Sequence, residues 1–236
     1  FPMAAYVSHD SWQYRGETYD EECDSDSDYY RENEIYSEEE EQEEDYFILD
    51  EIVENHLPKT WSDVDEQLVE LDRHSREFNK VVNKIQSTLK ITVQRVERVQ
   101  NSFLWGCYLL RKGEYKKRLR KPIREMELFH ATSEINVPSI VENNFDWRRT
   151  VRAKFGKGVS FSPSAGYANT YCNHKVGDNR ALILTRVLVG KCQNGSFEKK
   201  IPSDGYDTTL GYGNRVYVKY GDNEYYPEYV AYYQYH

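Results

Sequence analysis

The stretch that decides the fold lies at residues 128–133 and reads Leu-Phe-His-Ala-Thr-Ser. It continues a run that begins at Met126, and we expect residues 126–130 to form a strand. Ser133 can then open a short helix, because a proline such as Pro138 is tolerated in the first turns. A lone histidine at a strand end is more often structural than functional, so the meaning of His130 depends on the motifs around it.

Short strands and helices alternate beyond this stretch. We expect a strand at residues 158–162, a helix at 164–172 and a strand at 181–189, whose almost unbroken apolar run is typical of burial on both faces. Residues 216–220 and 229–233 are expected to close the chain as two strands joined by a Gly-Asp-Asn turn.

Two helices are expected upstream. Apolar residues between Phe78 and Leu89 recur at three- and four-residue spacing, and Ser75 is available as an N-cap. Asn101 can cap a second helix, after a loosely alternating strand at residues 91–99. The sequence therefore predicts an α+β fold of largely antiparallel sheets with short flanking helices, and no long crossover helix in the second half.

Charge divides the chain near residue 45. Residues 1–45 contain 17 acidic and two basic side chains, whereas residues 46–236 contain 23 and 29. The first part has almost no aliphatic residues to offset chain entropy, so we expect an acidic disordered tail. It is either a solvated spacer or a segment that competes with nucleic acid or presents acceptor carboxylates. We expect residues 46–236 to form one monomeric domain.

Several classes of protein are excluded by what the sequence lacks. No apolar run approaches the roughly 20 residues that span a bilayer, and no secretory signal is evident. The four cysteines form no C-x-x-C pair, which argues against a zinc site and a disulfide framework and favours an intracellular location, in the nucleus or the cytoplasm. Because the chain starts at Phe1, we expect it to be part of a longer protein.

The most basic part of the chain is residues 111–124, with eight arginines and lysines against one glutamate. This charge is enough to attract RNA phosphates through counterion release. The alternative is a solvated helix end and loop, since the run lacks the interleaved aromatic residues on which single-strand binders stack bases.

Common catalytic motifs are missing, among them the phosphate loop, G-x-S-x-G and H-E-x-x-H. The order of six segments is more informative. They lie at residues 128–133, 144–148, 155–161, in the tyrosine-rich helix that follows, and at 186–190 and 226–230. In this order they resemble the catalytic domain of the PARP family, the diphtheria-toxin-like ADP-ribosyltransferases. Residues 57–61 and 95–108 sharpen the resemblance to the mono-ADP-ribosylating branch that carries CCCH zinc fingers and WWE modules upstream.

The resemblance covers about residues 57–235 and implies NAD as substrate, with no metal. It places the family's H-G/A-T motif on His130, Ala131 and Thr132. In the family, the histidine binds the adenosine ribose, the next residue binds the nicotinamide carboxamide through its backbone, and the threonine hydroxyl supports the ribose side. Gly158 and Phe161 belong to the family's G-x-Y-F motif and are expected in the same NAD site.

Two positions depart from the family pattern. The tyrosine of the family's His-Tyr-Glu triad, which stacks on nicotinamide, falls on Ser160, so Tyr171 alone remains of the two stacking rings; Tyr167 lies nearby but aligns elsewhere. A base–aromatic stack is worth roughly 1–3 kcal/mol, so its loss would weaken binding by about one to two decades. Ala168 stands where the family usually offers a serine to the carboxamide, a hydrogen bond worth on the order of 0.5–1.5 kcal/mol.

The third triad position falls on Val216. Polymerising members of the family have glutamate there, and mono-transferring members have an apolar residue, so the resemblance implies no polymer synthesis. Glu228 belongs to the next strand and is interpreted as structural. The segment between Asp146 and Gly156 covers the donor site in the family; its four cations either pair with the pyrophosphate or form a solvated loop.

Two functions follow from the resemblance. The first is a weak mono-ADP-ribosyltransferase with NAD as donor, a protein or nucleic-acid acceptor, and His130, Ser160 and Val216 at the triad positions. The second is a catalytically inactive PARP-like module of an RNA-binding antiviral-type protein, which Ser160 and Ala168 favour. RNA would bind through upstream domains or the basic run at 111–124. We favour the first, because His130 and Tyr171 are present.

Overall fold

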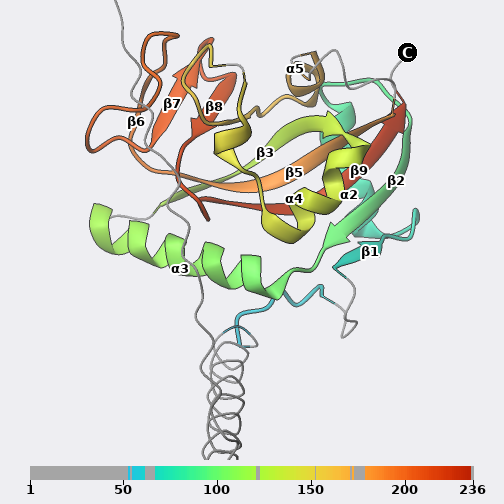
Figure 1. Cartoon of the computed structure of the whole chain (residues 1–236). Coiled ribbons are helices and arrows are strands. Elements are labelled where there is room, and N and C mark those ends of the chain that lie inside the picture. The colour runs from blue at the N-terminus through green and yellow to red at the C-terminus, as the bar shows by residue number, and fades with distance from the viewer. Residues whose placement is uncertain are drawn as a thin grey trace, which may run out of the picture. The chain divides into compact units, whose positions relative to one another are not determined.

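Figure 1 shows the computed structural model of the chain. The residues that it describes are 53, 55–61, 67–120, 123–151, 153–170, 172 and 179–234. The acidic tail expected at residues 1–45 lies outside them, as do Arg152 and Tyr171, so the predictions made for these parts of the sequence stay predictions.

A five-stranded antiparallel sheet forms the centre of the described region (Figure 1). Its strands, in spatial order, are β1 (Leu68–Glu70), β2 (Val93–Val99), β9 (Tyr225–Gln234), β5 (Asn179–Val189) and β3 (Arg124–Ser133). β5 lies between β9 and β3, and its side chains from Ala181 onward are buried except at Arg186. The apolar run at residues 181–189 therefore is a strand covered on both faces, as its sequence predicts.

A second, four-stranded sheet packs beside the first. Its strands, in spatial order, are β4 (Val159–Phe161), β8 (Val216–Lys219), β7 (Thr208–Gly211) and β6 (Cys192–Asn194). All its neighbours are antiparallel except β6 and β7. Backbone bonds between Phe129 of β3 and Ser162 join the two sheets.

The two strands at the end of the chain do not pair with each other. β8 belongs to the four-stranded sheet and β9 to the five-stranded sheet, so the turn between them carries the chain from one sheet to the other. β9 also begins at Tyr225, four residues before the expected start. Two apolar strands around a Gly-Asp-Asn turn have the pattern of a hairpin, and the pattern alone does not show that each strand has another partner.

Helices and short 3-10 turns accompany the sheets in the described residues. They are α2 (Arg76–Gln86), α3 (Ser102–Leu119), η1 (Glu134–Asn136), α4 (Val137–Asn143), η2 (Trp147–Arg149) and α5 (Ala165–Thr170). Two expected N-caps are confirmed, since Ser75 accepts from Phe78 N and Asn101 accepts from Leu104 N. Ser133 precedes η1 but makes no capping hydrogen bond with its side chain. The antiparallel α+β fold expected from the sequence is confirmed.

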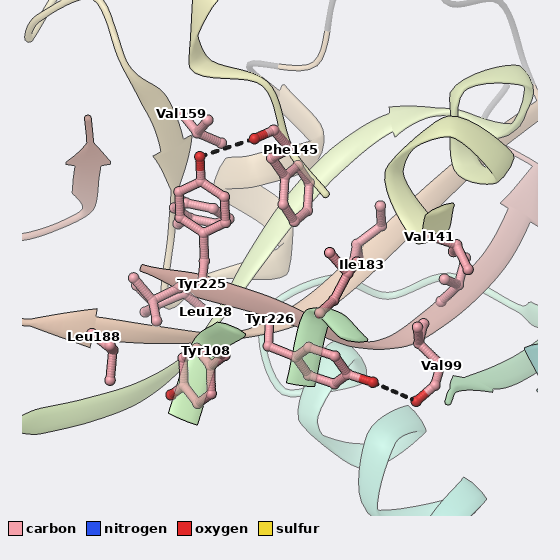
Figure 2. Close-up of a cluster of buried hydrophobic side chains, with 14 of the residues drawn as sticks. Val99, Tyr108, Leu128, Val141, Phe145, Val159, Ile183, Leu188, Tyr225 and Tyr226 are labelled. Carbon is pink, nitrogen blue, oxygen red and sulfur yellow. Dashed lines mark hydrogen bonds between the residues drawn. The ribbon is translucent and has the colours of Figure 1, made fainter. Parts of the chain in front are cut away.

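Tyrosines fill much of the core. Tyr225 and Tyr226 are adjacent in β9, so their rings point to opposite sides of the strand, as Figure 2 shows. The Tyr225 hydroxyl donates to Phe145 O at 2.9 Å, and the Tyr226 hydroxyl donates to Val99 O at 2.9 Å. Because both buried hydroxyls have partners, the rings add apolar contact area without leaving a polar atom unsatisfied.

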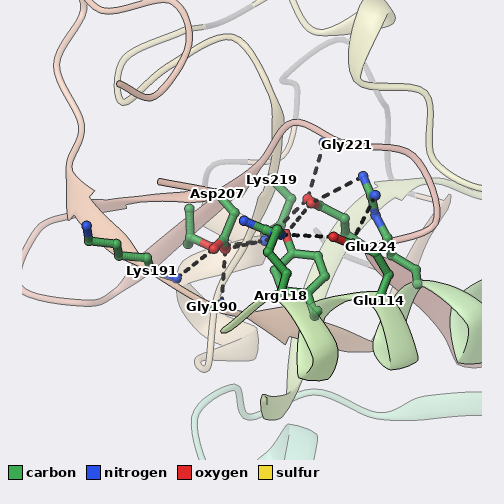
Figure 3. Close-up of polar contacts among 11 residues, drawn as sticks. Glu114, Arg118, Gly190, Lys191, Asp207, Lys219, Gly221 and Glu224 are labelled. Atoms are coloured by element: carbon green, nitrogen blue, oxygen red, sulfur yellow. Dashed lines mark hydrogen bonds and ion pairs between the residues drawn. The ribbon is translucent and has the colours of Figure 1, made fainter. Parts of the chain in front are cut away.

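One lysine lies in the interior. Lys219 at the end of β8 is 0% exposed, and its Nζ donates to Asp207 Oδ1 and Thr208 Oγ1, both at 2.9 Å (Figure 3). Glu224 Oε2 lies 3.3 Å from the same Nζ, and Glu224 also accepts from the Tyr115 hydroxyl. Two carboxylates thus offset the cost of burying this ammonium group.

Candidate functional site

A cavity of about 1040 Å³ lies where β3, β4 and β8 meet α4 and the loop around η2. Ligand pockets commonly enclose roughly 300–1,000 Å³, so the space is ample for a dinucleotide. The predicted site residues that line it are His130, Ala131, Thr132, Gly158, Ser160 and Val216. The structure therefore brings together residues that lie up to 86 positions apart in the sequence.

His130 has a defined protonation state. Its Nδ1 lies 3.0 Å from Ser160 O, and because a carbonyl only accepts, Nδ1 carries the hydrogen and Nε2 is left as an acceptor. Burial lowers the pKa of His130 below its ordinary value, more than the bond to Ser160 raises it. The ring also packs edge-on against Phe145 and Phe161, with centroids 5.0 and 5.9 Å apart. His130 is therefore neutral at pH 7 and held in one orientation.

The next two residues present polar groups at the end of β3. Thr132 accepts a hydrogen bond from the side-chain amide of Asn136 at 3.0 Å, so its own hydroxyl hydrogen stays available for a ligand. Asn136 lies in η1 and lines the same cavity. The sequence does not single out Asn136, which lies six residues after His130 and outside the motif.

The backbone of Ala131 faces the open edge of the sheet. β3 is the last strand in the order of its sheet, and Phe129 N and O on its outer edge bond to Ser162. Residues two apart in a strand direct their backbone groups to the same side, so Ala131 N–H and C=O point to the same outer edge.

The side chains of β4 point alternately to the core and to the cavity, as expected for a strand. Ser160 is exposed and lines the cavity, whereas its neighbour Phe161 is 1% exposed and packs into the core. Gly158 lies so close to β8 that a Cβ atom there would be 2.2 Å from Lys219 O. Any other residue at position 158 would push β4 away from β8.

Two of the predicted NAD-binding residues stand back from the cavity. Phe161 contacts the ring of His130 from the core side. Ala168 in α5 is partly buried against the apolar cluster that includes Phe129 and Ala165. Neither lines the cavity wall.

Aromatic rings outside the predicted NAD site also line or contact the cavity. Tyr167 and Phe155 line it, and Tyr212 contacts both, with ring centroids 6.3 Å from Tyr167 and 4.8 Å from Phe155. Lys154 donates to the Tyr212 hydroxyl. Tyr212 joins from the turn between β7 and β8, and nothing in the local sequence indicates that it reaches this wall.

The cations expected over the donor site have partners in the described part of the loop. Arg148 pairs with Asp222, and the Asp146 carboxylate accepts from Arg148 N at 2.9 Å. Arg149 Nε lies 3.6 Å from the same carboxylate. The bond from Arg148 N, together with the nearby guanidinium groups, holds the pKa of Asp146 below its usual range.

Glu228 lies away from the cavity wall. Its Oε1 accepts from Arg186 Nη2 at 2.5 Å, and Arg186 also pairs with Glu125 at 2.9 Å. Burial raises the pKa of Glu228, although Arg186 opposes the shift. These contacts favour the structural interpretation of this carboxylate.

The basic run begins inside α3 and extends beyond the end of this helix at Leu119. Three of its cations, Arg111, Lys112 and Arg118, pair with glutamates, while Lys116, Lys117, Arg120 and Arg124 are exposed. Lys121 lies outside the described residues.

Within the described ranges, no three His, Cys, Asp or Glu side chains gather as a metal site would require. The described helices include none with the length and apolar character needed to cross a bilayer. Among the described cysteines, Cys107, Cys172 and Cys192 are not joined in disulfide bonds.

Comparison with known proteins gives a consistent result. A family model described as the poly(ADP-ribose) polymerase catalytic domain matches residues 75–233. The chain is 30% identical over 210 residues to the mouse (Mus musculus) "Protein mono-ADP-ribosyltransferase PARP11", covering 74% of this chain and 63% of that protein. It is 35% identical over 180 residues to the human (Homo sapiens) "Protein mono-ADP-ribosyltransferase PARP12", covering 71% of this chain and 26% of that protein. The chain thus spans less than two thirds of the length of these relatives.

Proposed function

The chain belongs to the poly(ADP-ribose) polymerase catalytic-domain family, and on that premise we propose that it transfers single ADP-ribose units from NAD to a protein acceptor. The relatives above carry the name mono-ADP-ribosyltransferase, which supports the same reaction here. The observation that carries the proposal is the cavity in which His130, Ala131 and Thr132 line one wall together with Ser160 and Val216.

The geometry suits the binding of NAD. The neutral His130 offers Nε2 as an acceptor for a ribose hydroxyl, and Thr132 offers a hydroxyl hydrogen. The outer backbone edge at Ala131 offers one donor and one acceptor side by side, the pattern that a carboxamide complements. Departure of nicotinamide leaves positive charge on the ribose, so the main task of the site is to hold both groups still while that charge builds.

Val216 favours transfer of a single unit. Its side chain lines the cavity and has no atom that accepts a hydrogen bond from a ribose hydroxyl. Glu228, which could be mistaken for the missing glutamate, is paired with Arg186. Chain elongation therefore lacks the acceptor that the family uses for it.

Calorimetric titration of the full chain with NAD and, separately, with benzamide tests the donor site. We expect micromolar to submillimolar binding of both. His130→Ala should weaken NAD binding, whereas His74→Ala, an exposed histidine outside the cavity, is the matched control. Incubation with isotopically labelled NAD and mass spectrometry of the products should then find single ADP-ribose adducts. If neither ligand binds at millimolar concentration, the proposed function is wrong.

A second function, an inactive module with a PARP fold, is favoured by one observation. Ser160 exposes a hydroxymethyl group to the cavity at the position where the family has a ring. Ala168, which is set back from the cavity wall, offers no hydroxyl. Restoring both with Ser160→Tyr and Ala168→Ser separates the two functions. If automodification appears only in this double variant, the natural chain is the inactive module.

A further inference from the structure

An ion pair joins two segments that line the cavity but lie 74 residues apart. Arg148 in η2 and Asp222 in the turn after β8 form two parallel bonds, with Nη2 to Oδ2 at 2.7 Å and Nη1 to Oδ1 at 3.2 Å. This is the paired geometry in which a guanidinium group binds a carboxylate, and it is also the geometry in which it binds a phosphate.

The backbone on both sides of the pair is fixed by other contacts. Arg148 N donates to Asp146, and Phe145 O just before it accepts from the Tyr225 hydroxyl (Figure 2). On the other side, Gly221 N donates to Glu224 Oε2 at 3.2 Å, and Glu224 is held by the buried Lys219 (Figure 3). A change of partner at Arg148 therefore needs a rotation of the side chain and no movement of either segment.

Arg148 already has carboxylate partners at this wall. Arg148 contacts two carboxylates, since Asp146 Oδ1 also lies 3.2 Å from its Nη1. The hydrogen bonds to Asp222 are the first cause of the raised pKa of Arg148. A ligand that brings two phosphates into the cavity meets a cation whose donors are in use and a carboxylate that repels it.

We propose that Asp222 competes with the diphosphate of the donor nucleotide for Arg148, and so weakens donor binding. The inference rests on the proposed function, because it concerns the same cavity. Binding of a nucleoside diphosphate exchanges the Arg148–Asp222 pair for an arginine–phosphate pair and leaves Asp222 to solvent. Nicotinamide-like ligands carry no phosphate, so Asp222 does not affect them.

Titration of the full chain with ADP-ribose and with benzamide tests this. Asp222→Asn keeps the shape of the side chain and removes its charge, and we expect ADP-ribose to bind about two- to fivefold more tightly, in line with the modest strength of exposed ion pairs. Benzamide affinity should not change. Asp204→Asn makes the same change of net charge at an exposed position outside the cavity and should bind both ligands as the natural chain does.

A second pair of variants identifies the partner. Arg148→Gln should weaken ADP-ribose binding, and adding Asp222→Asn to it should give no further gain, because the competition no longer exists. The inference is overturned if Asp222→Asn leaves ADP-ribose affinity unchanged, or weakens it, since Asp222 would then be neutral or would position Arg148. If benzamide and ADP-ribose bind to none of the proteins, the proposed function fails and the inference with it.

Discussion

Two charged clusters share the turn at residues 221–224 and differ mainly in their exposure to water. On one side, Glu224 meets Lys219, whose side chain is 0% exposed. On the other side, Asp222 meets Arg148, and both side chains are more than half exposed. On the buried side the ion pair stabilises the fold, because loss of one partner leaves the other charge buried. On the exposed side the pair contributes little to stability, so a ligand can replace Asp222 as the partner of Arg148.

The largest effect on stability is expected when the cation of the buried cluster is removed. Lys219→Met removes the cation that Asp207 and Glu224 share and, among the described cations, leaves Glu224 only with Arg111, whose Nη2 lies 3.8 Å from Oε1. Removal of one partner from a buried ionic cluster costs about 3–5 kcal/mol. Denaturant unfolding measures the change. Lys116→Met is the matched control, because Lys116 is exposed on α3, and its free energy of unfolding should stay within about 0.5 kcal/mol. Equal stability of the two variants would contradict the contrast.

A substitution in the cavity wall should change ligand affinity and leave the free energy of unfolding nearly unchanged. Ser160→Tyr places a ring at an exposed position in the cavity, and a base–aromatic stack is worth roughly 1–3 kcal/mol. Benzamide should therefore bind about one to two decades more tightly, while the free energy of unfolding changes little. Ser203→Tyr, at an exposed position away from the cavity, controls for the added ring. A Ser160→Tyr protein that unfolds more easily and binds no better would show that the added ring does not fit at position 160.

The contrast also explains which features could be predicted from the sequence. The caps at Ser75 and Asn101 are local, because each side chain bonds three residues ahead, and both were predicted. The histidine motif in β3 was predicted because it is contiguous, but the strand continues to Ser133, three residues beyond the predicted end at His130. The pairing of Arg148 with Asp222 could not be predicted, since the two residues lie 74 positions apart and nothing in either segment specifies the other. The change of sheet after β8 was missed for the same reason.

Acid should affect the buried cluster in a defined direction. Burial raises the pKa of Asp207, but Lys219 and several hydrogen bonds outweigh it and hold that pKa below its usual range. A carboxyl group with a lowered pKa in the folded state stabilises the protein above its unfolded pKa, which is about 3.9, and this contribution is lost as the pH falls through the folded value. The free energy of unfolding should therefore fall below about pH 4 less steeply in Asp207→Asn than in the natural chain. Asp204→Asn is the control, and an identical slope in the two variants would show that Asp207 does not contribute.

The smallest effect on stability is expected from the exposed pair of Arg148 and Asp222. The dependence of stability on salt distinguishes this pair from the buried cluster around Lys219. Arg148→Met removes a guanidinium group that is 57% exposed, so the energy it contributes to folding is small and is screened by ions. Raising the salt concentration from about 0.1 to 1 M shortens the screening length from about 10 to 3 Å. Any difference between Arg148→Met and the natural chain in denaturant unfolding should disappear on this change, whereas the loss in Lys219→Met should persist, because no ion reaches the buried carboxylates. A salt-independent loss in Arg148→Met would mean that Arg148 holds the loop in place, and that it is not free to change partners.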